Sequence, residues 1–128
     1  MENCIFCRIV KGEIPCIKIW EDKNYLAILD VHPINPGHVL LMPKKHTEYL
    51  FDLKDKEYGE LMLAGKKIAI LIKNKLNPKK VGMAVEGFGV PHIHIHLVPV
   101  NNGNELNPER AKRAEKKDLE DIANKLKS

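Results

Sequence analysis

The sequence Pro91-His92-Ile93-His94-Ile95-His96-Leu97-Val98-Pro99 alternates histidine with aliphatic residues. Alternation with a period of two is typical of a strand, because successive side chains point to opposite faces. We therefore expect His92, His94 and His96 on one face of a strand and the aliphatic side chains on the other. The alternatives are a chance run or an adventitious metal-binding tract. An aliphatic residue at every alternate position and the closing proline argue against both.

The spacing of the three histidines limits what they can bind together. At a rise of roughly 3.3 Å per residue, the first and third lie about 13 Å apart on a straight strand, too far to bind one metal ion. We therefore predict a division of labour: one end histidine serves a metal, and the others face a substrate.

Length and composition bound the class of protein. A chain of 128 residues predicts a single domain, residues 1–128. It is 44% apolar and 30% charged, without an apolar run of membrane-span length, which predicts a soluble protein with no membrane partner. The first residues lack the regions of a signal peptide, so we expect a cytoplasmic location. The net charge of +4 comes with scattered lysine pairs and no interleaved aromatic residues, so we expect no nucleic-acid partner.

Apolar periodicity predicts an α+β fold. The expected strands are 16–21, 25–30, 38–43, 81–86 and 92–98. Apolar positions recur at helical spacing over 55–76, and Asn77-Pro78 ends that helix. Asn107 is expected to cap a last helix that begins at Pro108 and has the apolar stripe Leu119, Ile122, Ala123 and Leu126. The prediction is a five-stranded antiparallel sheet with one long central helix and a C-terminal helix.

Cys4 and Cys7 form a Cys-x-x-Cys pair. The spacing is that of zinc ligands, but a closed tetrahedral site needs two more. With Cys16 the total is three, an odd number that argues against a secreted disulfide framework. The alternative is a thioredoxin-like redox pair, which no helix N-terminus or flanking pattern supports. We favour zinc, and expect Cys16 to be structural.

The run His92-Ile93-His94-Ile95-His96-Leu97-Val98 resembles the signature of the histidine triad (HIT) family of nucleotide hydrolases and transferases. The similarity covers most of residues 4–100, including Ile5-Phe6 to Glu13-Ile14-Pro15, Leu26 to Asp30, and Pro36-Gly37-His38 to Pro43-Lys44-Lys45-His46. The resemblance implies a HIT-like fold and a homodimer. In the zinc-containing branch it also implies a structural zinc held by Cys4, Cys7, His46 and His92.

The resemblance further implies a nucleotidyl-histidine mechanism. His94 would attack the α-phosphorus of a nucleotide, and water would then release the nucleoside monophosphate. A neutral imidazole can do this near pH 7, because its unperturbed pKa is about 6.5. His96 would position or charge-balance the phosphate, while His38 would orient the nucleophile and backbone N–H groups would hold phosphate oxygens. The alternative for His38 is a satisfied buried histidine that opens a strand.

The remaining resemblance concerns nucleotide binding. Asp30 matches a carboxylate that, in the family, accepts hydrogen bonds from the ribose hydroxyls. The alternative role for Asp30 is that of a loop cap. An apolar slot for the base is implied at Ile5, Phe6, Ile9, Ile28, Leu29 and Val31. These residues could equally be core.

Two departures from the family pattern bear on the leaving group. The bend before the triad is shorter and has Phe88 and Gly89 where many relatives carry a polar residue. The tail after Pro108 differs from the Trp-containing tail of the phosphoramidate-cleaving branch.

We therefore predict a hydrolase or nucleotidyl transferase that cleaves a phosphoramidate-type α-phosphate of a purine nucleotide. The first alternative is asymmetric hydrolysis of a dinucleoside polyphosphate. The second is a zinc-stabilised nucleotide-binding module without turnover, which the Gly89 position makes conceivable.

Overall fold

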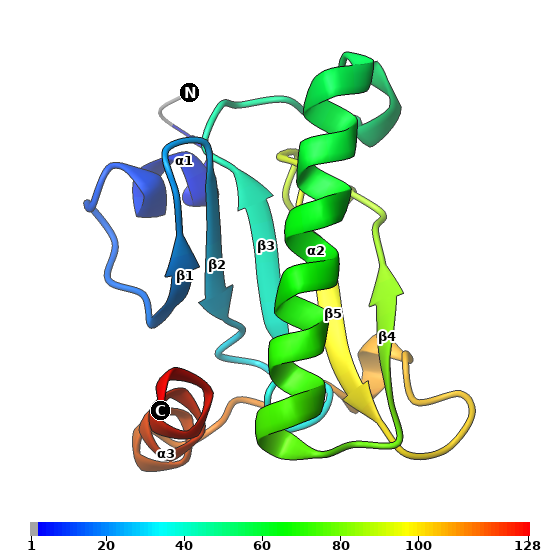
Figure 1. The fold of residues 1–128 in the computed structure, drawn as a ribbon. Helices are drawn as coiled ribbons and strands as arrows, with labels where there is room; N and C mark the ends of the chain where they lie inside the picture. The colour runs from blue at the N-terminus through cyan, green and yellow to red at the C-terminus, as the bar shows by residue number, and fades with distance from the viewer. Residues whose placement is uncertain (1–2) are drawn as a thin grey trace.

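A computed structural model describes residues 3–128 of the chain (Figure 1). Five strands form an antiparallel sheet in the order β1-β2-β3-β5-β4. The strands are β1 (Lys18–Glu21), β2 (Tyr25–Leu29), β3 (Val39–Pro43), β4 (Lys80–Ala84) and β5 (Ile95–Val100). The helices are α1 (Ile5–Val10), α2 (Asp55–Leu76) and α3 (Lys116–Lys127), with 3₁₀ turns at Leu50–Asp52 and Pro108–Arg110. The predicted α+β class, the antiparallel sheet, the long helix and the C-terminal helix are confirmed.

Different helices cover the two faces of the sheet. α2 lies along one face, where Leu61, Ile68 and Ile72 pack against β2, β3 and β5. α1 covers part of the opposite face, where Phe6 and Ile9 pack against alternate residues of β2 and β3. β2 and β3 are therefore buried at every position. This double cover explains why their sequences are continuous apolar runs.

The bounds of α2 agree with the sequence prediction. The C-cap Asn77 adopts the left-handed conformation, with φ 53° and ψ 44°, and its N–H donates to the carbonyl of Lys73. Asparagine tolerates this conformation, and the following Pro78 cannot continue the helix. The stop signal in the sequence therefore corresponds to the observed cap.

The N-terminal helix α1 was not predicted. Cys4 is its N-cap, and its sulfur accepts the N–H of Cys7 at 3.4 Å. The prediction that no helix N-terminus lies at the Cys-x-x-Cys pair was therefore wrong. A helix of six residues is too short to show a repeating apolar stripe in the sequence.

The C-terminal helix begins at Lys116, and the predicted start at Pro108 was wrong. Asn107 does cap a turn there, because its side chain accepts the N–H of Glu109 at 3.0 Å. The chain then extends, and the N–H of Ala114 donates to the carbonyl of Val31 at 3.0 Å. A hydrogen bond to a distant segment thus replaces the helical bond that the local signal favoured.

The last strand begins at Ile95, three residues later than predicted. Pro91 has no N–H to donate, and the N–H of Ile93 donates to the carbonyl of Thr47 at 2.8 Å instead of to β3. The segment before β5 therefore lies outside the sheet, and His92, three residues before the strand begins, is fully buried. The other strands begin and end within two residues of the predicted bounds.

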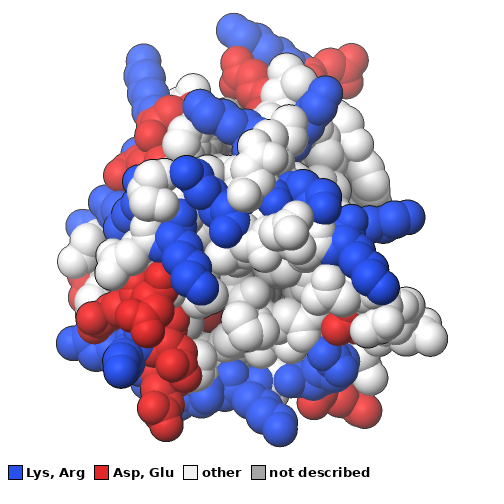
Figure 2. Space-filling view, turned by 60° about the horizontal axis from the view of Figure 1, so that its bottom comes forward, with Lys and Arg blue, Asp and Glu red and all other residues white. Residues whose placement is uncertain are grey.

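One face of the molecule carries charges of both signs. Figure 2 shows one face, on which Lys and Arg side chains are dispersed among uncharged and acidic ones. Within residues 3–128, no helix combines the length and apolar character needed to cross a membrane.

Candidate active site and metal centre

Four metal-ligating side chains converge between α1 and the segment before β5. Cys4, Cys7, His46 and His92 each bring one ligand atom within 4.8 Å of the others. The sulfurs of Cys4 and Cys7 lie 3.3 and 3.5 Å from Nδ1 of His92. The Cys7 sulfur also lies 3.3 Å from Nδ1 of His46. We call these four residues the Cys/His cluster.

An acceptor oxygen lies behind each ring of the Cys/His cluster and leaves Nδ1 free for a metal. Nε2 of His92 lies 2.8 Å from the carbonyl oxygen of Pro43, which can only accept, so Nε2 carries the proton. Nε2 of His46 lies 3.5 Å from Oε2 of Glu48, which favours the same tautomer. Burial lowers the pKa of His92 and keeps this ring neutral. Two sulfurs and two imidazoles are the kind of donor set that closed tetrahedral zinc sites use.

The cap of α1 bears on the redox alternative for the Cys-x-x-Cys pair. Reactive cysteines also use helix N-termini, where their pKa is lowered. Here burial, and then the neighbouring Cys4, raise the pKa of the Cys7 thiol. A bound cation would reverse this shift by favouring the thiolate. The geometry therefore fits metal binding better than thiol–disulfide exchange.

A second group of histidines lies on the same face of the sheet as α1. Nδ1 of His38 accepts the N–H of Ile34 at 3.0 Å, so the proton of neutral His38 is on Nε2. This N–H donates to Nδ1 of His96 at 2.9 Å. His96 must then carry its own proton on Nε2. Oδ2 of Asp30 lies 3.6 Å from Nε2 of His38. We call Asp30, His38, His94 and His96 the histidine relay.

The two hydrogen-bonded rings of the histidine relay, His38 and His96, are neutral at pH 7. Burial lowers the pKa of His38 to about 4, and Asp30 opposes this shift only in part. Burial, followed by the neighbouring His94, also lowers the pKa of His96. The direction of the hydrogen bond between the two rings is therefore fixed by the N–H of Ile34.

His94 is held in the opposite tautomer. Its Nδ1 lies 2.7 Å from the carbonyl oxygen of His92, so Nδ1 carries the proton and Nε2 has a free lone pair. The rings of Phe6 and His96 pack edge-on against it, with centroid distances of 4.8 and 5.0 Å. A neutral, oriented imidazole with a free lone pair is the form that acts as a nucleophile.

A cavity of about 330 Å³ opens beside the histidine relay. All four relay residues line it, together with the bend before the triad and the C-terminal tail. The bend contributes Glu86, Phe88 and Gly89, among others. The acidic side chains in this lining are Asp30 and Glu86, and the lining contains no Lys or Arg among the described residues. None of the Cys/His cluster lines it.

The structure does not bring the predicted nucleotide-binding residues into one slot. Asp30 lines the cavity, and its Oδ1 accepts the N–H of His32 at 2.8 Å as a loop cap. Leu29 packs in the core on the α2 side, because neighbouring strand residues face opposite ways. Ile5 and Val31 are 44% and 40% exposed. The other three are buried together under α1: Phe6, Ile9 and Ile28.

Sequence reasoning missed the residues of the tail that line the cavity. Leu106, Pro108 and Ala111 all do so. The sequence indicates a helix start at Asn107-Pro108, and no local pattern shows that this segment returns to the cavity. Glu48 was also missed, although a carboxylate two residues after His46 is a recognisable signal for an outer partner of a metal ligand.

Comparisons with known proteins agree on one family. Residues 11–103 match the model described as the HIT domain. The adenosine 5'-monophosphoramidase of Schizosaccharomyces pombe is 38% identical over 102 residues, which cover 78% of this chain and 76% of the relative. An uncharacterized HIT-like protein of Methanocaldococcus jannaschii is 37% identical over 105 residues, which cover 79% of this chain and 81% of the relative.

Solved structures share the fold over nearly the whole chain. A Zn-bound histidine triad family protein from Mycobacterium smegmatis matches with a TM-score of 0.83 and 33% identity, over 98% of this chain and 91% of that one. A Hit-like protein from Bartonella henselae matches with a TM-score of 0.86 and 27% identity, over 99% and 96%. On sequence and on structure, the chain belongs to the HIT domain family.

Proposed function

We propose that this chain, as one HIT-like domain, is a nucleotide phosphohydrolase that cleaves a substituted α-phosphate of a purine nucleotide. The observation that carries the proposal is the pair of opposite tautomers at one cavity. His94 offers a lone pair on Nε2, and His96 offers an N–H on Nε2. A nucleophile and a hydrogen-bond donor are the groups that displacement at phosphorus needs. The name of the Schizosaccharomyces pombe relative supports this reaction class.

The proposed reaction has two displacements. In the first, Nε2 of His94 attacks the α-phosphorus, the bond to the leaving nitrogen breaks, and that nitrogen takes a proton from water and departs as a neutral amine. In the second, water attacks the same phosphorus and loses a proton to solvent, the bond to His94 breaks, and the nucleoside monophosphate leaves while His94 returns to its neutral form. In both steps, the Nε2–H group of His96 donates a hydrogen bond to a phosphoryl oxygen and keeps its proton. The N–H of His94 remains bonded to the carbonyl of His92, which stabilises the charge on the ring.

The charge of the cavity favours a phosphoramidate over a dinucleoside polyphosphate. Each further phosphate brings negative charge toward Asp30 and Glu86, and no Lys or Arg among the described lining residues offsets it. Repulsion between like charges is strong where water is partly excluded. We therefore place the polyphosphate reaction second. The free lone pair of His94 argues against a binding module without turnover.

A substrate panel tests the proposed function. Adenosine and guanosine phosphoramidates, sulfates and polyphosphates are offered to zinc-loaded protein, with His94→Ala as the control. We expect wild-type turnover to be fastest with phosphoramidates and to be lost in the control. Faster turnover of polyphosphates would support the first alternative. Nucleotide binding without any turnover would support the second.

We also propose that Cys4, Cys7, His46 and His92 hold one structural zinc. Four protein donors leave no position for substrate, and none of the four lines the cavity. The Zn-bound relative from Mycobacterium smegmatis supports the choice of metal. Metal analysis of protein never exposed to a chelator should find about one zinc per chain. A zinc content near zero would contradict this proposal.

We propose a homodimer formed through apolar side chains on α2 and β4. Leu63 and Ile70 are 69% and 50% exposed and lie seven residues apart, so they share one face of α2. Met83, on the edge strand β4, is 43% exposed. Light scattering at micromolar concentration should report a dimer for the wild type and a smaller species for Leu63→Glu. A wild-type monomer would contradict the proposal.

We propose a cytoplasmic location for the protein. Cys4, Cys7 and Cys16 form no disulfide. Such thiols persist in reducing compartments. Fractionation of the source cells tests the location.

A further inference from the structure

Asn35 joins three segments of the chain beside the histidine relay. Its Nδ2 donates to the carbonyl of Pro99 at 2.8 Å and to Oε2 of Glu105 at 3.2 Å. Its Oδ1 accepts from Nη2 of Arg110 at 2.7 Å. Its backbone carbonyl accepts the N–H of His38 at 3.2 Å. The end of β5, the C-terminal tail and the loop before β3 therefore meet at one amide.

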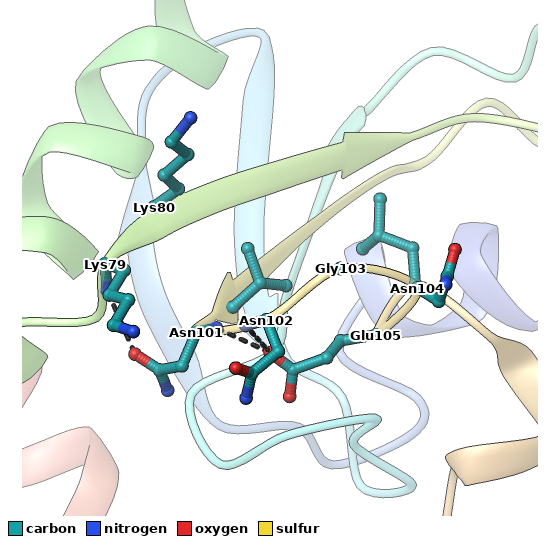
Figure 3. Close-up of a pocket in the computed structure, with 9 residues that line it drawn as sticks. Lys79, Lys80, Asn101, Asn102, Gly103, Asn104 and Glu105 are labelled. Atoms are coloured by element: carbon teal, nitrogen blue, oxygen red, sulfur yellow. Dashed lines mark hydrogen bonds between the residues drawn. The ribbon is translucent and has the colours of Figure 1, made fainter.

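Glu105 holds Asn35 from the side of the tail. Figure 3 shows its carboxylate turned back toward Asn101 and Asn102, whose N–H groups donate to Oε1 at 2.5 and 2.6 Å. Its Oε2 accepts from both Asn35 and Arg110 at 3.2 Å. These backbone hydrogen bonds lower the pKa of Glu105, so the carboxylate stays charged near neutral pH. The Glu105 carboxylate thus links the segment after β5 to the loop before β3.

Two further backbone bonds tie the tail to the same loop. The N–H of Lys112 donates to the carbonyl of Pro33 at 3.4 Å, and that of Ala114 donates to the carbonyl of Val31 at 3.0 Å. Gly37, at the end of this loop, has φ 95°, and a Cβ there would collide with the side chain of Leu76. The loop conformation is therefore determined by contacts from several sides.

This loop sets the proton positions in the histidine relay. The N–H of Ile34 donates to Nδ1 of His38, which keeps the His38 proton on Nε2. If that donor moves away, the proton of neutral His38 can shift to Nδ1, and Nε2 then accepts from His96. His96 would carry its proton on Nδ1 and present a lone pair to the cavity in place of an N–H. The hydrogen-bond donor for the phosphate would be lost.

We propose that Asn35, held by Glu105 and Arg110, is a positioning residue for catalysis. It fixes the loop whose N–H at Ile34 keeps His38 donating to His96, so that His96 presents its own N–H to the cavity. The inference rests on the proposed function, in which His96 donates to a phosphoryl oxygen. It adds that the C-terminal tail is a working part of the active site.

The first experiment compares Asn35→Ala with the matched control Asn101→Ala. The Asn101 side chain accepts one backbone N–H, from Lys79 at 3.0 Å, and has no bond to the loop before β3. For Asn35→Ala we expect kcat to fall by about 10- to 100-fold, because a displacement of about 1 Å at supporting residues has that effect. KM should change by less than about threefold, since the binding contacts remain. The control should keep kcat within about twofold.

The second measurement needs no substrate. Long-range proton–nitrogen NMR spectra of histidine-labelled protein report which nitrogen of each neutral ring carries the proton. Wild-type His38 and His96 should both show a protonated Nε2. In Asn35→Ala, signals of a protonated Nδ1 should appear for both rings, whereas a purely structural loss would leave the pattern unchanged.

An exposed position gives a second variant in case Asn35→Ala does not fold. The Arg110 side chain is 43% exposed, so Arg110→Ala should keep the fold. We expect kcat to fall by about 3- to 10-fold, and Arg110→Lys, which retains a donor for Asn35, to recover at least about half of the loss. Wild-type kcat in a folded Asn35→Ala, or a lower kcat with unchanged imidazole spectra, would overturn the inference. If the wild type hydrolyses no nucleotide, the proposed function fails, and the spectra alone still decide whether Asn35 sets the tautomers.

Discussion

The Cys/His cluster and the histidine relay use the same side chain for opposite purposes. In the cluster, the Nε2 atoms of His92 and His46 face the Pro43 carbonyl and the Glu48 carboxylate, which leaves Nδ1 lone pairs beside the two sulfurs. In the relay, Nδ1 of His94 donates to a carbonyl, which leaves the lone pair on Nε2. The partner behind each ring, rather than the histidine itself, therefore decides what the ring can do.

The two sites also differ in access, and one carbonyl connects them. His92 is fully buried away from the cavity, whereas His94 and His96 line it. The carbonyl of His92 accepts the N–H of His94, so a residue of the cluster helps to hold the proposed nucleophile in place. The buried Cys/His cluster is thus joined by one hydrogen bond to the open histidine relay. Each of the following experiments disturbs one of the two sites.

The largest effect is expected in the relay. His94→Ala removes the nucleophile, and turnover should fall by at least about 10³-fold, while nucleotide affinity stays within about tenfold because the binding contacts remain. His96→Ala should weaken catalysis less. Rapid-quench mass spectrometry under mildly alkaline conditions should locate a nucleotidyl adduct on His94. An adduct on His92 or His96, or robust turnover by His94→Ala, would overturn the assignment.

The next effect is expected in the Cys/His cluster, and it concerns stability. Cys4→Ala removes one of four ligands, and we expect loss of zinc and a fall in Tm of about 15 °C, because metal binding contributes directly to folding. Turnover measured below the melting point should fall much less. Cys16→Ala, at a partly buried cysteine outside the cluster, is the control and should keep both its zinc and its Tm. Loss of all turnover in a folded Cys4→Ala would indicate a catalytic metal instead.

The sequence predicted the long helix and the sheet, but not the contacts between distant segments that complete the two sites. α2 and the sheet follow from apolar periodicity, whereas α1 is too short to show a period. Spacing alone identified Cys4 and Cys7, and the family resemblance added the two histidines. The bond between Asn35 and Glu105 joins residues 70 positions apart. No local pattern predicts such a bond, because it depends on how the tail crosses the folded domain.

A third experiment uses pH to test the burial of the relay. The pKa of His38 is lowered to about 4, below its ordinary value of about 6.5, so the unfolded chain binds more protons between these values. Stability should therefore fall as pH drops through this window, by at most about 3 kcal/mol from this residue. His38→Gln should lose less stability than wild type between pH 7 and 4, as measured by urea unfolding. Loss of metal in acid affects both proteins, so the difference between them isolates His38, and parallel curves would contradict the prediction.

The smallest effect is expected at the outer partner of the Cys/His cluster. The partner of His92 is a backbone carbonyl, which no substitution removes, so Glu48 beside His46 is the position to change. Glu48→Gln keeps the shape and an acceptor oxygen but loses the charge. Its side chain is 62% exposed, so water can take over part of its role. We expect zinc affinity to fall by about tenfold, the lower end of the range for such partners, with turnover unchanged.

Competition with a chromogenic chelator measures this difference, and Glu120→Gln is the matched control. Glu120 lies on α3, where its only described ion pair is an exposed one with Lys116 at 4.0 Å. Its substitution should leave zinc affinity unchanged. A loss far above tenfold in Glu48→Gln would mean that the carboxylate binds the metal directly and that the site is not closed by four donors. No loss would mean that water, and not Glu48, orients the His46 ring. Within the cluster, only His92 would then have its ring orientation fixed by a protein group, as the rings of the relay do.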